Sequence, residues 1–276
     1  MRSALEADWL SASRRAAGVL REVLAELPTT AERAVEVGRG AGGDRTLVID
    51  QRAEDAVFSE LDALHAQGHR FVAVSEERGE VDYGDPGVRV VIDPIDGSLN
   101  AKRAIPAHAL SLAVADGPTM ADVAFGFVFD LGSGEEFVAR RGAGATLNGT
   151  VLSREPRERR RGDKLEVLGI ESAEPRWVAQ SAQQLVGLAH RLRALGTIAV
   201  TLCQVAAARF DGMLTLKSCR AVDAAAGQLI VREAGGQVAF IRFDDPLAAP
   251  LDLIAHSPLV AARTADGLAM LADVPR

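Results

Sequence analysis

The sequence predicts a layered fold of mixed helices and strands, of the α/β or α+β class. Residues 88–150 form a run of short β-prone segments separated by turn residues, which indicates an antiparallel meander. Residues beyond 165 instead alternate strand-like with helical segments, and no internal repeat is present. Because helices and sheets bury their apolar faces against one another, this order of elements predicts stacked layers.

The first half should begin with two helices. Residues 3–26 carry apolar side chains at helical spacing, and Pro28 ends the pattern. Val35–Gly43 is glycine-rich and is predicted to be an exposed loop, whereas Thr46–Ile49 is β-prone. Asp50 then has the side chain expected of a residue that opens a helix, and apolar positions follow it on one face.

Strands are expected next, at His69–Val74, Val88–Ile92, Ala109–Ala115, Ala121–Phe129 and Glu135–Ala139. Gly79–Gly87 is predicted to be a turn region, and Asp130–Gly134 has the composition of a hairpin turn.

A polar segment, Ser153–Lys164, is expected to join two halves of the chain, residues 1–155 and 156–276. The first half would supply the antiparallel sheet and most of the acidic site residues, and the second would complete the site. The segment holds five arginines: Arg154, Arg157, Arg159, Arg160 and Arg161. A solvated linker is the preferred interpretation of these charges, and a patch that steers phosphate is the alternative.

The second half is expected to mix helices and strands. Strands are predicted at Leu165–Ile170, Gly212–Leu216, Gln237–Phe243 and Leu253–Ala255, and helices at Trp177–Leu192, Thr197–Phe210, Asp223–Ala234 and from Pro258 onward. Gly235 and Gly236 stand where a helix C-terminus favours glycine.

Composition narrows the functional classes. The net charge of −7 argues against a general nucleic-acid binder, which needs an excess of Lys and Arg. The two cysteines, Cys203 and Cys219, form no CxxC pair, so no zinc site is indicated and a reducing cytosol is expected. Charged residues interrupt any signal-peptide pattern, and the longest apolar run, Ala194–Ala208, is too short to span a membrane. We therefore expect a soluble, cytoplasmic protein with no membrane partner.

Two expected strands lead into acidic residues: Glu76 and Glu77 after one, and Asp93 and Asp96 after the other. Pro94 fixes its own φ and keeps Asp93 extended, so the chain can turn at once and both aspartates can face one point. Carboxylates that converge repel one another unless cations lie between them. Their hard oxygen atoms favour Mg²⁺, Mn²⁺ or Ca²⁺.

The residues after Asp96 suit an anion. Gly97 permits a positive φ or a close approach by a ligand, and Ser98 adds a hydroxyl and the start of a helix whose N–H groups could hold phosphate oxygens. The alternative is an ordinary surface turn, since Asp-Pro and Asp-Gly are common turn dipeptides. Asp223 is likewise interpreted either as a simple N-cap or as a further member of the site.

Five segments resemble signatures of the inositol monophosphatase family, and they occur in the family's order along the chain. From the N-terminus, Gly43–Asp50 is similar to GxxTxxxD, Ser75–Gly79 to (S/G)EExG, Asp93–Asn100 to DPIDGTxN, Arg193–Ala199 to RxxG(T/A)xA and Asp223–Gly236 to WDxAAGxxIvxEAGG. The resemblance implies the layered αβαβα sandwich shared with fructose-1,6-bisphosphatase, and a homodimer.

The resemblance also implies a site with two to three Mg²⁺ ions, for which Mn²⁺ could substitute. Glu76, Asp93 and the carbonyl of Ile95 would hold the first ion. Asp93, Asp96 and Asp223 would hold the second, and Glu76 would reach a weaker third ion through water.

The implied reaction is hydrolysis by metal-activated water, with no covalent phosphoenzyme. Ser98 with Asp50 would help to activate the water, the N–H groups of Gly97 and Ser98 would bind phosphate, and Gly196 and Thr197 would line the substrate pocket.

Some positions depart from the family pattern. Ala101–Pro106 lacks the aromatic residue and glycine that usually follow Asn100, and Val222 replaces a tryptophan. Leu216 stands where animal members have a glutamate that contacts inositol hydroxyls, whereas Arg220 resembles archaeal members that also hydrolyse fructose-1,6-bisphosphate. No departure removes an implied metal ligand.

The leading hypothesis is therefore an Mg²⁺-dependent phosphatase of a small sugar or polyol phosphate, with inositol-1-phosphate first and fructose-1,6-bisphosphate next. Nucleotide-type substrates and histidinol phosphate are further family options. Arg220 and Lys217 are interpreted either as holders of a second phosphate or as surface charges. The alternative from another class is a catalytically weak relative that acts through protein contacts, suggested by the unusual loop 101–105 and the Arg-rich segment 154–161.

Overall fold

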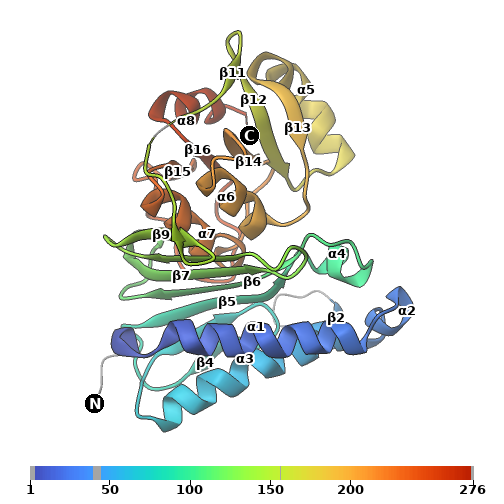
Figure 1. The fold of residues 1–276 in the computed structure, drawn as a ribbon, viewed down its shortest axis with the longest axis vertical. Helices are drawn as coiled ribbons and strands as arrows, with labels where there is room; N and C mark the ends of the chain where they lie inside the picture. The colour runs from blue at the N-terminus through green and yellow to red at the C-terminus, as the bar shows by residue number, and fades with distance from the viewer. Residues whose placement is uncertain (1–3, 40–44, 156, 275–276) are drawn as a thin grey trace.

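The computed structural model describes residues 4–39, 45–155 and 157–274. Figure 1 shows helices and sheets stacked in alternating layers, which confirms the αβαβα order. Helices α1 (Trp9–Glu26) and α3 (Val48–Ala66) form the first layer, on one face of an eight-stranded sheet. Helices α6 (Ile198–Ala206) and α7 (Ala221–Glu233) lie between this sheet and a six-stranded sheet, and α5 (Pro175–Leu188) and α8 (Ala265–Leu271) cover the outer face of the second sheet.

The first sheet has the strand order β10-β9-β8-β7-β6-β5-β3-β4. Its strands are β3 (Val72–Ser75), β4 (Gly79–Asp82), β5 (Arg89–Asp96), β6 (Ala109–Ala115), β7 (Val123–Asp130), β8 (Glu136–Arg140), β9 (Gly144–Leu147) and β10 (Thr150–Val151). Every neighbouring pair from β5 to β10 is antiparallel, as the meander prediction requires, and only β3 and β5 pair in parallel. The carboxyl ends of β3 and β5 therefore meet at one edge of the sheet.

The second sheet has the order β11-β12-β14-β16-β15, and β13 also pairs with β12. Its strands are β11 (Arg160–Arg161), β12 (Lys164–Glu171), β13 (Ala189–Arg193), β14 (Gly212–Thr215), β15 (Gln237–Phe240) and β16 (Leu259–Ala262). The remaining short elements are the 3₁₀ turns η1 (Ala4–Glu6) and η2 (Met120–Asp122), the helices α2 (Thr30–Arg33) and α4 (Ser98–Lys102), and the ribbon of β1 (Glu36–Arg39) and β2 (Arg45–Leu47).

Alternation along the strands explains how the first sheet buries both faces. In β5, Val90 and Ile92 pack against α1 and α3, whereas Val91 packs against the α6–α7 layer. Successive side chains of a strand point to opposite faces, so a strand covered by helices on both sides needs apolar residues at every position. Strand β6 nearly meets this requirement: six of its seven residues are apolar, and all seven, including Ser111, are buried.

Helix α1 begins later than the sequence pattern indicated. Its first residue is Trp9, because the carboxylate of Asp8 accepts a hydrogen bond from Ser11 N at 3.1 Å and caps the helix there. The loop expected over Val35–Gly43 was wrong in part, since residues 36–39 form β1; residues 40–43 lie outside the described part of the chain. The ribbon pairing with β2 is a contact that local composition does not reveal.

Both helices expected to open at an aspartate begin two residues earlier. Helix α3 starts at Val48 and α7 at Ala221, so Asp50 and Asp223 occupy the third helical position. Each aspartate accepts a hydrogen bond, at 3.0 Å, from the backbone N–H of the residue before the helix. The acids thus cap the helices by reaching back, as the third residue of a capping box does.

Four further expectations were wrong in their element type. The turn region after Gly79 contains strand β4, and the helix expected over Trp177–Leu192 ends at Leu188 and gives way to β13. Leu253–Ala255 forms bends instead of a strand, and the helix expected from Pro258 is strand β16 followed by α8. For β13 and β16 the outcome depends on pairing with a strand that is distant in sequence.

Each arginine of the Arg-rich segment forms an ion pair. The pairs are Arg154 with Glu233, Arg157 with Glu155, Arg159 with Asp211, Arg160 with Glu158 and Arg161 with Glu166. Residue 156 lies outside the described part of the chain, and residues 160–161 form β11. Because each of these guanidinium groups already has a carboxylate partner, the structure favours the solvated connection over a phosphate-steering patch. Within the described residues, no helix is long and apolar enough to cross a membrane.

Candidate active site

A bulge in β5 brings two aspartates to one side of the sheet. Asp93 pairs with Ser111 of β6 and Asp96 pairs with Ala109, so three steps on β5 oppose two on β6. In a regular strand, residues three apart point to opposite faces; the extra residue restores a common direction. Pro94 lies within the bulge. A residue there does not need to donate a hydrogen bond to the neighbouring strand, so the lack of an N–H in proline is tolerated.

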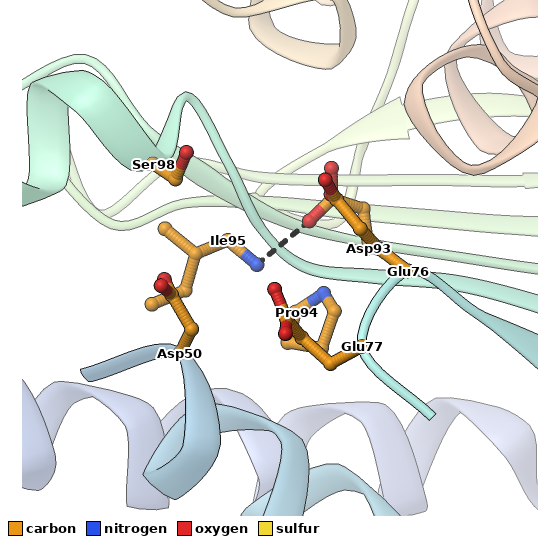
Figure 2. A pocket seen from close by; sticks show the side chains of 7 residues that line it. All are labelled: Asp50, Glu76, Glu77, Asp93, Pro94, Ile95 and Ser98. Atoms are coloured by element: carbon orange, nitrogen blue, oxygen red, sulfur yellow. Dashed lines mark hydrogen bonds between the residues drawn. The ribbon is translucent and has the colours of Figure 1, made fainter. Parts of the chain in front are cut away.

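Three carboxylates from different elements meet beside this bulge. Glu76 follows β3, Asp93 lies in β5 and Asp223 lies in the first turn of α7, and one oxygen of each lies within 4.8 Å of the others. Figure 2 shows Glu76 and Asp93 together at one side of the pocket. The parallel pairing of β3 and β5 explains the first two positions, and the capping bond of Asp223 fixes the third.

These acids perturb one another strongly. Burial raises the pKa of Asp93 well above its usual range, and the charges of Glu76, Asp96 and Asp223 raise it further. Burial and the charge of Asp223 raise the pKa of Asp96 to about 8, and burial raises that of Asp223 to about 6. Clustered carboxylates with such shifts are a favourable environment for cations, which would remove the repulsion.

Arg220 is the cationic side chain nearest to this cluster. Its guanidinium lies 2.6 Å from an oxygen of Glu76 and 3.9 Å from Asp223. Arg220 therefore lies at the acid cluster itself, and it partly compensates the negative charge there. Oxygen ligands from several carboxylates are nevertheless the donor set that Mg²⁺ and Mn²⁺ prefer, so the residues present fit a divalent ion.

A pocket of about 80 Å³ opens beside the acids. Figure 2 shows the residues that line it: Asp50, Glu76, Glu77, Asp93, Pro94, Ile95 and Ser98. Asp50 comes from the start of α3 and Ser98 from the start of α4, so together with the ends of β3 and β5 four strand or helix ends meet at the pocket. Burial, together with the charges of Glu77 and Glu76, raises the pKa of Asp50 to about 6, although the bond from Leu47 N lowers it.

Gly97 joins the acids to α4. Its φ is +91°, and a Cβ there would lie 2.9 Å from the carbonyl oxygen of Ala107 and 3.1 Å from that of Gly196. The position therefore demands glycine for both conformation and space. The short distance to Gly196 also shows that Asp93–Asn100 packs against the segment before α6.

A second, larger pocket of about 540 Å³ lies on the other side of Asp96. Asp96, Asp223, Gly196, Thr197 and Lys217 are among the residues that line it. Oδ2 of Asp96 accepts hydrogen bonds from the Thr197 hydroxyl and from Ala199 N, both at 2.6 Å. Asp96 and Asp223 therefore lie between this pocket and the other acids, Glu76 and Asp93.

Sequence reasoning missed two buried glutamates next to the site. Glu171, the last residue of β12, bonds to the segment that precedes α6. Glu54 lies four residues after Asp50, on the same face of α3, and accepts a hydrogen bond from the Ser75 hydroxyl at 2.9 Å. Both could have been suspected: Glu171 ends a strand, as the predicted acids do, and Glu54 has helical spacing from Asp50.

Glu54 should make the stability of the metal-free protein depend on pH. Its side chain is only 2% exposed, and burial raises its pKa from 4.5 to about 7. An acid whose pKa is raised by folding binds its proton more tightly in the folded state. The resulting stabilisation, about 3 kcal/mol, is present below pH 4.5 and is lost as the pH rises through about 7.

Glu54→Gln has no proton to lose, so this part of the pH dependence should vanish. Urea unfolding of both proteins at about pH 5 and about pH 8 measures it, and the variant should gain about 3 kcal/mol relative to wild type between the two. Asp55→Asn is the control, since Asp55 is exposed and paired with Arg78. Parallel stability curves for Glu54→Gln and wild type would contradict the shift.

Comparison with known proteins gives a consistent result. A family model described as the inositol monophosphatase family matches residues 4–273. The fructose-1,6-bisphosphatase/inositol-1-monophosphatase of Archaeoglobus fulgidus is 34% identical over 236 residues, 84% of each chain. The Nus factor SuhB of Escherichia coli strain K12 is 33% identical over 216 residues, 74% of this chain and 75% of the relative.

Solved structures agree in fold. A crystal structure of an inositol monophosphatase–fructose 1,6-bisphosphatase has a TM-score of 0.82 at 24% identity, covering 97% of this chain and 100% of that one. The extragenic suppressor protein SuhB of Bartonella henselae has a TM-score of 0.77 at 25% identity, covering 96% of this chain and 97% of that one. The layered fold is therefore shared across the whole described chain.

Proposed function

Because the chain belongs to the inositol monophosphatase family, whose members are metal-dependent phosphatases of phosphorylated sugars or polyols, we propose that it hydrolyses a small phosphate monoester with bound Mg²⁺. Inositol-1-phosphate is the substrate that we propose first. The observation that carries the proposal is the meeting of Glu76, Asp93 and Asp223 within 4.8 Å beside a pocket that also contains Asp50 and Ser98.

The residues that would hold the ions are Glu76, Asp93, Asp96, Asp223 and the carbonyl of Ile95. Two to three Mg²⁺ ions are proposed, with Mn²⁺ as a substitute. When bound, they would supply a water of lowered pKa and positive charge for the attacking and leaving oxygens. The raised pKa values of the aspartates support this, since the cluster lacks enough positive charge of its own.

The chain's own groups would complete the reaction. Burial raises the pKa of Asp50 to about 6, which suits a general base near neutral pH, and we propose that it accepts the proton of the attacking water through the Ser98 hydroxyl. The N–H groups of Gly97 and Ser98 would bind phosphate oxygens. Gly196 and Thr197 would contact the sugar or polyol, because they line the larger pocket.

The experiment that tests the activity compares kcat/KM for inositol-1-phosphate and fructose-1,6-bisphosphate, measured as phosphate release with Mg²⁺. We expect turnover of both, with inositol-1-phosphate preferred. Fructose-1,6-bisphosphate is the alternative principal substrate, supported by the name of the Archaeoglobus relative. Absence of turnover on every sugar or polyol phosphate tried would contradict the proposal.

Lys217 should discriminate between these substrates. It lines the larger pocket next to Asp223, and its exposed ammonium group can meet a second phosphate that inositol-1-phosphate lacks. Lys217→Gln should therefore lower kcat/KM for fructose-1,6-bisphosphate about 10-fold and leave inositol-1-phosphate within about twofold. Lys164→Gln, at the first residue of β12 and outside the lining of this pocket, is the control. Equal losses on both substrates would contradict the assignment of Lys217.

We propose in addition that the protein works in the cytoplasm as a homodimer, without nucleic-acid or membrane partners. The net charge of −7 supports the exclusion of nucleic acid. Several similar proteins have SuhB names, and those of Escherichia coli and Haemophilus influenzae are named Nus factors; this favours a second candidate, a role through protein contacts. The complete set of acids argues that such a role would accompany turnover, not replace it.

A further inference from the structure

Glu171 is a buried carboxylate at the end of β12, with 2% of its surface exposed. Its Oε1 accepts hydrogen bonds from Leu195 N at 3.0 Å and from the Thr201 hydroxyl at 2.6 Å, and its Oε2 accepts one from Gly196 N at 2.9 Å. Within the described residues, it forms no ion pair with Lys or Arg. Burying a carboxylate is costly unless it is well hydrogen-bonded, so these three donors are what allows the charge to lie there.

The backbone that Glu171 holds leads directly to Asp96. Leu195 and Gly196 are followed by Thr197, whose hydroxyl donates to Oδ2 of Asp96 at 2.6 Å. The same oxygen accepts a bond from Ala199 N, also at 2.6 Å. Two of the groups that orient Asp96 therefore come from the segment whose start Glu171 fixes.

The same segment, residues 195–197, also contacts Asn100, the last residue of Asp93–Asn100. Leu195 O accepts a hydrogen bond from the side chain of Asn100 at 2.6 Å. Gly196 has a φ of +78°, and a Cβ there would lie 2.8 Å from Asn100 Nδ2. The segment thus fits tightly between Glu171 and Asp93–Asn100, so a shift at Glu171 would be transmitted to the residues around Asp96.

We propose that Glu171 is a positioning residue that fixes residues 195–197 and, through Thr197, orients Asp96 toward the metal site. The inference rests on the proposed function, in which Asp96 is a metal ligand. Groups that hydrogen-bond to metal ligands typically contribute 10–100-fold to metal affinity or activity. Here the contribution passes through a backbone segment, so it depends on the acceptor geometry of Glu171 and not on its charge alone.

Glu171→Gln keeps the size of the side chain but replaces one acceptor oxygen by an NH₂ group, which would face a backbone N–H. Thr201→Val removes one donor and leaves both oxygens of Glu171 in place. Glu174→Gln is the matched control. Glu171 and Glu174 both line the larger pocket and are both glutamates. The carboxylate of Glu174, however, pairs with Arg176 at 2.6 Å and makes no described contact with residues 195–197.

The test is calorimetric titration of Mg²⁺ into the metal-free proteins, with thermal unfolding as a check on folding. At least one Mg²⁺ dissociation constant should rise 10–100-fold in Glu171→Gln, and Thr201→Val should show a smaller rise. Glu174→Gln should bind Mg²⁺ within about twofold of wild type, because the charge of an exposed carboxylate that is paired with Arg176 is screened by solvent.

Wild-type affinity in Glu171→Gln, or an equal loss in Glu174→Gln, would overturn the positioning role. If Glu171→Gln does not fold, Thr201→Val decides: unchanged Mg²⁺ affinity in that variant also overturns the role. The titration needs no substrate, so a wild-type protein that binds Mg²⁺ but releases no phosphate would refute the proposed activity and still test Glu171. A wild type that binds no Mg²⁺ would overturn both.

Discussion

Asp93→Asn should lower kcat at least about 10³-fold, since a ligand shared by two metal ions supplies several kcal/mol of transition-state stabilisation. The variant should nevertheless fold. Asn retains an oxygen that can accept the bond from Ile95 N, which lies 2.9 Å from Asp93 Oδ1. Replacing the carboxylate also removes repulsion from Glu76, Asp96 and Asp223, so the metal-free variant should unfold at the same temperature as wild type or higher.

Two measurements separate a metal ligand from a merely structural residue. Added Mg²⁺ should raise the melting temperature of wild type, because an ion that binds the folded state stabilises it. It should not raise that of Asp93→Asn, which would bind the ion poorly. Asp116→Asn removes the same charge from a surface pair with Arg141 and should retain both turnover and the Mg²⁺ effect. Turnover near the wild-type rate in Asp93→Asn would refute the assignment of Asp93.

Gly97→Ala should damage both stability and catalysis. A left-handed φ of +91° costs an alanine about 1–2 kcal/mol, and the contacts of 2.9 Å and 3.1 Å with backbone oxygens add to that cost. We expect a melting temperature lower by roughly 5 °C. Relief of the clash must move Gly97 or its neighbours, so Asp96 and Ser98 would be displaced on either side, and kcat/KM should fall about 10²-fold.

Gly149→Ala isolates the conformational part of this effect. Gly149 also has a positive φ, +77°, but a Cβ there would meet no atom within 4 Å. It should lose stability by a similar conformational cost and keep full phosphatase activity. If Gly97→Ala turns over as fast as Gly149→Ala, then the fit of Gly97 against Ala107 and Gly196 has no role in the reaction.

The meander was predictable because its signals are local. Ala109–Ala115 coincides with β6, and Asp130–Gly134 supplies the turn between β7 and β8 that its composition indicated. Strand β13 was not predictable in the same way. Ala189–Arg193 continues a helical pattern, and only its parallel pairing with β12 makes it a strand. The layer order came from the family resemblance, and the division into halves at residues 155 and 156 stays a prediction.

The acids of the site were identifiable because each follows or opens an element that sequence patterns detect. Glu76 follows the apolar strand β3, Asp93 lies after the apolar residues of β5, and Asp50 and Asp223 lie in the first turns of helices. What the sequence could not give was the bulge at Pro94, which turns Asp93 and Asp96 to one side. Nor could it give the role of Glu171, which depends on partners 24 to 30 residues away in the chain.

The most direct test of the metal-dependent activity is phosphate release by wild-type protein, first stripped of metal with EDTA and then supplied with increasing Mg²⁺. We expect no release of phosphate from inositol-1-phosphate without metal, and full recovery with Mg²⁺ or partial recovery with Mn²⁺. Release that continues at the same rate in the stripped protein, or that never appears with either ion, would contradict this expectation.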